Sequence, residues 1–560
     1  FNCLAFTSLI QHPANKRINI KKMNTTLLNT LKLLLLFLPT FLVAQNRYWV
    51  SFTDKNESIE LYKPTDFLST LSLERRANQN IEIQSNDYPV SPSYKNEIKQ
   101  LGYSIYRESR WLNAVSIQVD EIDNLSTLKD LDFVKSVHKV KSYYREITPT
   151  TENNFVLDDS DYGASFGQIA QLNGHLLHEQ GYKGAGKTIA VIDASFYKVD
   201  TLDMFDSLWA NNQILDTWDF VLNQPLDYTN DTIGSHGTMV LSCMGGYMKD
   251  SLIGTAPKSS YLLYRTEDSS SEMLTEEDNW VVAAEQADAF GSDVINTSLG
   301  YSNLWDDLEN THTYADMDGN TTVITIAADI AASKGMLVVN SAGNSGTSEW
   351  YFITAPADGD SVLTVGAIGA DSLIASFSSH GPTADGRIKP NVVSQGIASV
   401  VCNLEGGIRT ANGTSFSSPI LAGMAASAWS ALPAISSMDL YNLIQESAHL
   451  YPNGNNDYGY GIPNFSALLQ YVKLPESTSN TLSYYPNPVT DFVVLDLSEF
   501  QQQQPITISI FNPIGLRVYS ETITSQSNSQ LNLSNLAPNT VYILIAEQEK
   551  KEYICKFVKF

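Results

Sequence analysis

The chain has 560 residues, with 35 Lys and Arg against 61 Asp and Glu, a formal net charge of −26 and a hydrophobic fraction of 43%. This length exceeds one ordinary domain and the chain is too apolar to be disordered, so we expect two to four globular domains. The acidity argues against a nucleic-acid-binding protein, because neutralising phosphates requires a surplus of Lys and Arg. The four cysteines form no CxxC or Cys/His spacing, so a structural zinc site is not expected, and pairing of Cys243 with Cys402 stays open.

Residues 1–44 have the features of a targeting segment. A basic pair precedes Met23, the expected start, and an apolar run from Leu31 ends at Ala44. A basic flank, a short apolar core and a small exit residue are typical of a secretory signal peptide. A membrane anchor is the alternative, but about a dozen apolar residues fall short of the ~20 that span a bilayer. We therefore expect an exported chain with no transmembrane anchor.

The next block, residues 45–155, predicts a small α+β domain. Strand-like runs lie at 48–53 and 133–140, and a helix-compatible stretch lies at 67–80. Polar sequence rich in Thr, Asn and Asp then links this block to the following one.

The central block, residues 156–473, alternates short apolar runs with helical stretches. The compact apolar runs are 188–192, 261–264, 294–297, 336–340 and 362–366. Such alternation predicts an α/β domain with a mostly parallel sheet covered by helices on both faces. Reactive groups in folds of this kind collect at the carboxyl ends of the strands.

A polar linker, 474–483, precedes the last block, residues 484–560. Four strand-like runs separated by turn residues lie at 493–497, 506–510, 531–533 and 542–545. This pattern predicts a small β-sandwich.

Three segments of the central block place a reactive side chain beside small residues. Asp193 ends the first apolar run, His236 lies in Ser-His-Gly-Thr, and Ser415 lies in Asn-Gly-Thr-Ser-Phe-Ser-Ser-Pro. Each has an ordinary explanation by itself: a cap or turn for Asp193, a core position for His236 and a helix N-cap for Ser415. Together they supply the hydroxyl nucleophile, the base and the buried carboxylate that nucleophilic catalysis requires.

These segments resemble the three signature motifs of the subtilisin-like serine peptidases, the subtilase family. His236-Gly-Thr-x-Val240 and Gly413-Thr-Ser-x-Ser-x-Pro419 match the family patterns in the order Asp, His, Ser, for which subtilisin is the type case. The resemblance covers about residues 162–472. It implies a subtilisin-like three-layer fold in which Ser415 is the nucleophile, His236 the base and Asp193 the residue that orients His236.

The resemblance also implies an oxyanion hole and a substrate cleft. Asn344, in Asn-Ser-Ala-Gly-Asn-Ser-Gly, would donate its side-chain amide to the oxyanion, and the backbone N–H of Ser415 would be the second donor. An extended peptide would pair with one strand edge and would be walled by a second segment. The corresponding residues are Ser298, Leu299 and Gly300 for the edge and Ala342 and Gly343 for the wall, with 354–356 near the base of the pocket. Because we find no acidic residue placed to floor that pocket, we expect a neutral or apolar preference.

Two further motifs of the central block resemble functional sites. His380 begins a second His-Gly pair, but it matches a structural turn of the family. The Asp-Met-Asp-Gly-Asn run from Asp316 resembles the start of a calcium loop, yet position twelve is Ala327, which excludes an EF-hand. No cofactor or catalytic metal is expected, and a structural calcium ion is compatible with the family.

The flanking blocks follow from the same resemblance. Block 45–155 is similar in size and position to subtilase inhibitory pro-domains. The turn Tyr485-Pro-Asn-Pro-Val489 and the basic end Lys556–Phe560 resemble the C-terminal sorting domains of type IX secretion in Bacteroidota, the alternative being a substrate-binding sandwich.

We therefore expect a secreted or cell-surface serine endopeptidase, made as a zymogen, that acts on proteins or peptides through an acyl-enzyme. Its partners would be these substrates and the type IX secretion machinery. The rival is a catalytically silent peptide-binding or adhesion protein on the same fold. Ala194 and Ser195 keep that rival open, because the family usually has a hydroxyl residue and then glycine after the Asp.

Overall fold

The computed structural model describes residues 46–119, 125–140, 151–152, 161–231, 234–268, 275–302, 312–471 and, with short gaps, 480–559. The predicted signal peptide and most of both predicted linkers lie outside these residues. Within them, no helix is both long enough and apolar enough to cross a membrane.

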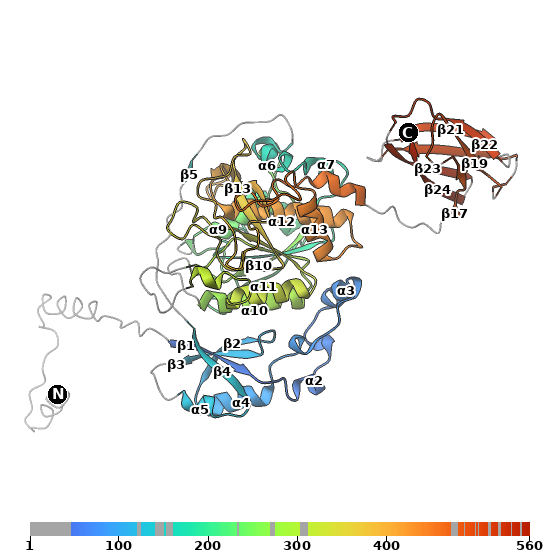
Figure 1. Cartoon of the computed structure of the whole chain (residues 1–560). Helices are drawn as coiled ribbons and strands as arrows, with labels where there is room; N and C mark the ends of the chain where they lie inside the picture. The colour runs from blue at the N-terminus through green and yellow to red at the C-terminus, as the bar shows by residue number, and fades with distance from the viewer. Residues whose placement is uncertain are drawn as a thin grey trace, which may run out of the picture. The chain divides into compact units, whose positions relative to one another are not determined.

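The N-terminal domain, residues 46–140, is a four-stranded antiparallel sheet in the order β2-β3-β1-β4, with helices beside it (Figure 1). Its main elements are β1 (Asn46–Phe52), α3 (Thr70–Asn78), α4 (Pro92–Gln100), β2 (Ser104–Ser109), β3 (Ala114–Val119), α5 (Ser126–Lys129) and β4 (Val134–Val140). Ile98 of α4 is buried in one cluster with Val50 and Ile117 of the sheet. The α+β prediction is confirmed.

A seven-stranded sheet with parallel pairing throughout forms the centre of the next domain, in the order β14-β13-β12-β11-β6-β10-β7. Its strands are β6 (Thr188–Asp193), β7 (Ile214–Asp219), β10 (Ser260–Arg265), β11 (Val294–Thr297), β12 (Leu337–Ser341), β13 (Val362–Ile368) and β14 (Val392–Gln395). All five predicted apolar runs lie in it. The run for β7, Ile-Leu-Asp-Thr-Trp-Asp, escaped prediction because this edge strand is half polar and only partly buried.

Alternate residues of β6 enter two different cores. Ile189 and Val191 pack with α9 (His236–Gly245) and α12 (Thr414–Ala431) on one face. Ala190 and Ile192 pack with α10 (Thr275–Phe290) and α11 (Val323–Ser333) on the other. Because side chains alternate along a strand, a continuous apolar run fills both cores, and the predicted three-layer fold is confirmed.

The C-terminal region forms two sheets that share one apolar core. The larger sheet has the order β17-β24-β23-β20-β21 and the smaller β18-β19-β22. Their bounds are β17 (Asn480–Thr481), β18 (Tyr484–Tyr485), β19 (Phe492–Asp496), β20 (Pro505–Phe511), β21 (Arg517–Thr524), β22 (Asn528–Asn532), β23 (Thr540–Gln548) and β24 (Lys551–Lys559). The strand-rich prediction is confirmed.

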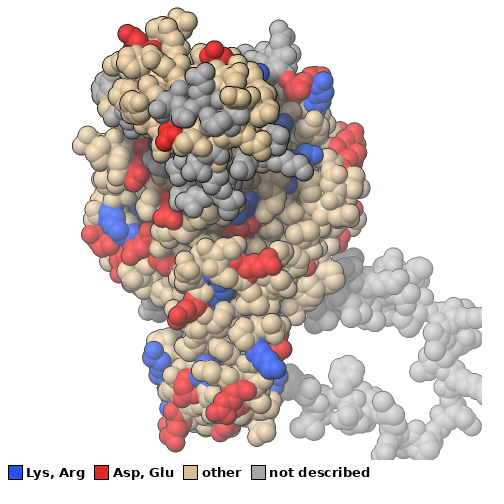
Figure 2. All heavy atoms as spheres, turned by 90° about the vertical axis from the view of Figure 1, so that its right-hand side faces the viewer, with Lys and Arg blue, Asp and Glu red and all other residues tan. Residues whose placement is uncertain are grey.

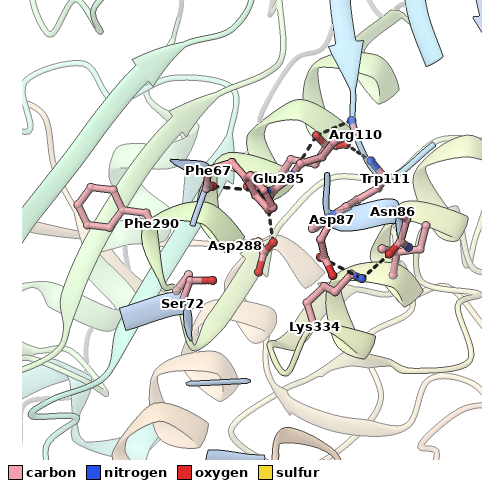
Figure 3. A network of polar contacts seen from close by, with 12 residues as sticks. Phe67, Ser72, Asn86, Asp87, Arg110, Trp111, Glu285, Asp288, Phe290 and Lys334 are labelled. Carbon is pink, nitrogen blue, oxygen red and sulfur yellow. Dashed lines mark hydrogen bonds and ion pairs between the residues drawn. The ribbon is translucent and has the colours of Figure 1, made fainter. Parts of the chain in front are cut away.

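A buried ionic network joins the N-terminal domain to α10 and α11 (Figure 3). The carboxylate of Asp288, on α10, forms ion pairs with three arginines of the N-terminal domain. These are Arg75, Arg76 at an N–O distance of 2.8 Å and Arg110 at 2.6 Å. At the end of α11, Lys334 pairs with Asp87 of the same domain at 3.1 Å. These side chains are almost inaccessible to solvent, unlike the acidic side chains scattered over the face drawn in Figure 2.

Cys243 and Cys402 form no disulfide with each other in this structure. Both thiols are free and buried. Burial raises the pKa of both thiols, that of Cys402 to about 12, so they stay protonated and unreactive at neutral pH.

Candidate active site

Asp193 lies at the carboxyl end of β6, near the middle of the sheet, and is fully buried. Its Oδ1 accepts hydrogen bonds from His236 Nδ1 at 2.7 Å and from the Ala194 N–H at 2.7 Å. Its Oδ2 has no hydrogen-bond partner among the described residues. A carboxylate at Nδ1 fixes the proton on that nitrogen, which leaves Nε2 of His236 as the atom that can accept a proton.

His236 begins α9, and the next residue explains how the helix comes so close to β6. A methyl group on Gly237 would lie 2.4 Å from the Ser195 carbonyl oxygen and 3.0 Å from Asp193 Cβ, so a larger residue has no room. Burial opposes a charge on the imidazole, but the charge and hydrogen bond of Asp193, with the charge of Glu267, raise the pKa of His236. Asp193 therefore stabilises the protonated form of the His236 ring.

Ser415 is the second residue of α12, directly after a sharp entry into the helix. Gly413 has a φ of 149°, a backbone conformation that side chains disfavour, and its N–H donates to the Gly396 carbonyl at 2.8 Å. Ser415 Oγ lies 3.4 Å from the Ser298 carbonyl oxygen, and Ser298 Oγ donates to the Ser415 carbonyl at 2.9 Å. The ring of Phe416, the next residue, lies 6.0 Å from that of His236, so the motifs of α9 and α12 meet here.

Asn344 lies on the exposed loop after β12, and its side chain has a fixed orientation. Its Oδ1 accepts hydrogen bonds from the Thr414 N–H at 2.9 Å and the Thr414 hydroxyl at 3.1 Å. Because Oδ1 of Asn344 already accepts these two hydrogen bonds, Nδ2 of the same amide is the atom that can donate a hydrogen bond beside Ser415.

The two expected substrate segments follow neighbouring parallel strands. Ser298, Leu299 and Gly300 come directly after β11, and Ala342 and Gly343 come directly after β12. The side chain of Asn340, at the end of β12, donates to the Leu299 carbonyl at 3.2 Å. The structure thus brings all nine predicted site residues to the carboxyl end of one sheet.

Arg265 is a site residue that the sequence reasoning missed. It lies opposite Asp193 in the backbone register of β10 and β6 and is buried. Its Nε donates to the Ala194 carbonyl at 3.0 Å, and its Nη1 donates to Asp219 Oδ2 at 2.8 Å. An arginine ending the apolar run Tyr-Leu-Leu-Tyr was the signal that could have found it, because a buried strand seldom carries an unpaired charge.

Neither of the other two motifs belongs to this site. His380 Nδ1 pairs with Asp457 at 2.8 Å, and its ring stacks on Tyr351. Both carboxylate oxygens of Asp318 accept hydrogen bonds within its own loop, from the Asn320 N–H at 2.8 Å and from the Thr321 hydroxyl at 2.9 Å. No group of three or more His, Cys, Asp or Glu arranged for a metal occurs in the described ranges, and the calcium ion stays a prediction.

Three family models match the chain. The subtilase family model matches residues 184–461, and the model of the peptidase S8 propeptide domain of Bacteroidota matches residues 47–154. The model of the secretion system C-terminal sorting domain matches residues 483–559.

Several subtilisins are similar in sequence. Subtilisin E of Bacillus subtilis (strain 168) is 27% identical over 386 residues, which cover 68% of this chain and 87% of the relative. Subtilisin DY of Bacillus licheniformis is 30% identical over 293 residues, covering 52% of this chain and 93% of the relative. Subtilisin of Bacillus pumilus is 29% identical over 306 residues, covering 54% and 98%.

Proposed function

This chain belongs to the subtilase family of serine peptidases, and from this premise we propose that it cleaves peptide bonds with Ser415, His236 and Asp193 as its catalytic residues. The matches to a propeptide and to a sorting domain confirm that the protein is made with a pro-domain and is secreted or held at the cell surface. The observation that carries the assignment is the 2.7 Å contact between a fully buried carboxylate and the Nδ1 of His236.

In the proposed reaction, rotation about Cα–Cβ turns Ser415 Oγ from the Ser298 carbonyl toward His236. Nε2 takes the hydroxyl proton while Oγ bonds to the peptide carbonyl carbon. The C–N bond then breaks, and the departing amine takes the proton from Nε2, leaving an acyl-enzyme. Water repeats the sequence, giving its proton to Nε2 and its oxygen to the acyl carbon, and Ser415 leaves with the returned proton.

Charge that develops on the carbonyl oxygen needs donors fixed in advance. We assign this role to Asn344 Nδ2 and to the backbone N–H of Ser415. The two hydrogen bonds that Asn344 Oδ1 accepts from Thr414 support the assignment, because they hold the amide without relying on substrate. Donors preset in this way cost no reorganisation during the reaction.

Substrate binding is assigned to the two segments after β11 and β12. Ser298, Leu299 and Gly300 would pair with an extended peptide, and Ala342 and Gly343 would wall the pocket for the residue before the scissile bond. This placement suits an endopeptidase acting on protein or peptide substrates.

A catalytically silent peptide-binding protein remains the second candidate. The observation in its favour is the bare Oδ2 of Asp193, which follows from Ala194 having no hydroxyl to offer. The two candidates separate when the exported protein and its Ser415→Ala variant are incubated with a fluorophosphonate probe. We expect label on the wild type alone; no label on the processed wild type would favour the silent protein, and equal label on both would misplace the nucleophile.

A further inference from the structure

Three loops of the peptidase domain meet at the acidic run that resembles the start of a calcium loop. The Ala384 N–H donates to the Met317 carbonyl at 2.8 Å, and the Gly319 N–H donates to Asp358 Oδ2 at 2.8 Å. Like charges at close range repel one another, so this junction needs a cation. The loops are residues 316–320, 358–362 and 383–387, and their aspartates are Asp316, Asp318, Asp358, Asp360 and Asp385.

The guanidinium of Arg387 lies among these carboxylates. Its Nη1 lies 2.9 Å from Asp360 Oδ1, and its Nε donates to Asp385 Oδ2 at 2.8 Å. A methyl group on Gly319 would lie 2.5 Å from Nη2 of Arg387 and 2.7 Å from Asp360 Oδ1, so the loop backbone packs directly on the ion pair. The side chain is 30% exposed, yet both Nη atoms are buried. One guanidinium therefore lies against all three loops.

The acidic surroundings keep Arg387 charged. Burial lowers the pKa of Arg387, but the hydrogen bond of Asp385 and the negative charges around it outweigh burial and raise that pKa above its ordinary value. In return, the hydrogen bond from Arg387 lowers the pKa of Asp385. The cation and the carboxylates thus stabilise one another in their charged forms.

A second side-chain cation holds the middle loop from the inside. Nζ of Lys389 donates to the Gly359 carbonyl at 2.8 Å, to the Val362 carbonyl at 2.7 Å and to two side-chain oxygens at 3.0 Å. Oxygens gathered around one positive charge are the donors that a hard metal ion would take. Because burial lowers the pKa of Lys389 to about 7, Arg387 is the cation of the two that stays charged at every accessible pH.

The remaining oxygens at the junction do not fit a calcium ion, which takes six to eight of them. Both oxygens of Asp318 are engaged within its own loop. Asp358 is fully buried, and its second oxygen, Oδ1, accepts from the Thr325 hydroxyl at 2.7 Å. Across the described residues, no three acidic or histidine side chains converge as metal ligands. The cation already in contact with the carboxylates is Arg387.

We propose that Arg387 supplies, from within the chain, the positive charge that a calcium ion would supply at this junction, so that the three loops are held together without a metal. This inference disagrees with the calcium ion that the sequence suggests at Asp316. It goes beyond the proposed function and does not depend on the catalytic residues.

The test measures hydrogen exchange of residues 316–320 and 358–362 in a Ser415→Ala background, which prevents self-cleavage, with excess chelator and then with excess calcium. In this parent protein we expect the same exchange rates under both conditions. In Arg387→Gln the carboxylates lose their counter-charge, so exchange with chelator should rise by at least about tenfold. Calcium should reverse most of this rise, because it can take the place of the lost charge.

Two further variants control for shape and for net charge. Arg387→Lys keeps the positive charge without the planar fork, and we expect it to stay insensitive to chelator. Lys258→Gln removes one positive charge from an exposed position outside the three loops, and exchange in the loops should not change.

Each outcome decides the proposal. Loss of protection in the parent protein on chelation would overturn it, because a bound metal ion would then hold the loops. Unchanged exchange in Arg387→Gln, or a rise that calcium does not reverse, would overturn it too, as would chelator sensitivity of Arg387→Lys. If Arg387→Gln folds under neither condition, the parent protein and Arg387→Lys still decide. Since the background is inactive, none of these results bears on the proposed function.

Discussion

Two fully buried carboxylates of the peptidase domain have opposite surroundings. Asp288 is met by three guanidinium groups, from Arg75, Arg76 and Arg110 of the pro-domain. Asp193 is met by one imidazole and one backbone amide, and one of its oxygens is bare. Burial raises the pKa of a carboxyl, but at Asp288 the three guanidiniums outweigh this effect and hold its pKa below the ordinary value.

The difference separates a carboxylate that joins two domains from one that serves a reaction. Guanidinium stays charged at every accessible pH, so Asp288 is neutralised permanently and its role is to hold the pro-domain against α10. Imidazole gains and loses its proton near neutral pH, so the Asp193 charge is compensated only when His236 is protonated. Because the charge of Asp193 is not compensated while His236 is neutral, the site favours the protonated His236 that forms during the reaction.

The largest effect is expected from removing the charge of Asp193. In Asp193→Asn the amide still fits, but it no longer fixes the tautomer of His236 or stabilises its charged form. We expect kcat to fall by about 10⁴-fold, because an amide at this position leaves the imidazole in the wrong tautomer. The exposed Asp206→Asn is the matched control and should keep wild-type activity. A loss below about tenfold would show that Asp193 does not orient the base.

Asp288→Ala tests the other carboxylate and should act on docking. In a Ser415→Ala background, which prevents self-cleavage, the variant leaves three buried guanidiniums without their shared acceptor. We expect docking of the pro-domain to weaken by about 3–5 kcal/mol. Hydrogen exchange should show protection lost in β1–β4 while the seven-stranded sheet stays protected.

The control for Asp288→Ala is Lys95→Ala, which breaks the more exposed pair of Lys95 with Glu108 inside the pro-domain. Such a pair contributes about 0–1 kcal/mol, so protection should hardly change. Equal effects of the two variants would mean that the buried network does not hold the domains together.

The two carboxylates also differ in how far the sequence reveals them. Asp193 ends a continuous apolar run, and the motifs around His236 and Ser415 complete the pattern of the family. Its role could therefore be predicted from the resemblance. Asp288 sits on a helix of mixed composition, and its partner Arg75 lies 213 residues away in the chain. No local pattern links such residues, because the pairing exists only once the domains dock. The buried parallel strands were predicted because each is a continuous apolar run, whereas the edge strand β7 was missed because it is half polar and only partly buried.

Asp278, at the start of α10, is a third buried carboxylate, and we expect it to make docking depend on pH. Trp49 of the pro-domain donates its indole N–H to Asp278, and Glu277 and Arg47 also face this group. Burial raises the pKa of Asp278 to about 8, whereas the undocked carboxyl returns toward the ordinary 3.8. The docked form therefore binds more protons between about pH 4 and 8, and docking weakens as the pH rises through this window.

We expect the docking constant, measured by hydrogen exchange in the Ser415→Ala background, to fall by up to about tenfold per pH unit as the pH rises toward 8. Asp278→Asn keeps the shape and cannot titrate, so it should flatten the profile and favour docking at pH 8. The same slope in this variant would assign the pH dependence to other groups.

The smallest expected effect concerns a second acidic residue whose negative charge acts on His236. Glu267 is the second carboxylate that raises the pKa of His236, and Tyr301 donates to it at 2.7 Å. Because His236 must be neutral to accept the proton of Ser415, activity falls as the pH drops through the pKa of His236, which lies above the ordinary value of a histidine. Glu267→Gln removes one negative charge, so the acid limb of kcat/KM should move to lower pH by less than about one unit, with Asp206→Asn as control. A shift as large as that caused by losing Asp193 would mean that the imidazolium is stabilised by the wider acidic surroundings and not by the one carboxylate in contact with it.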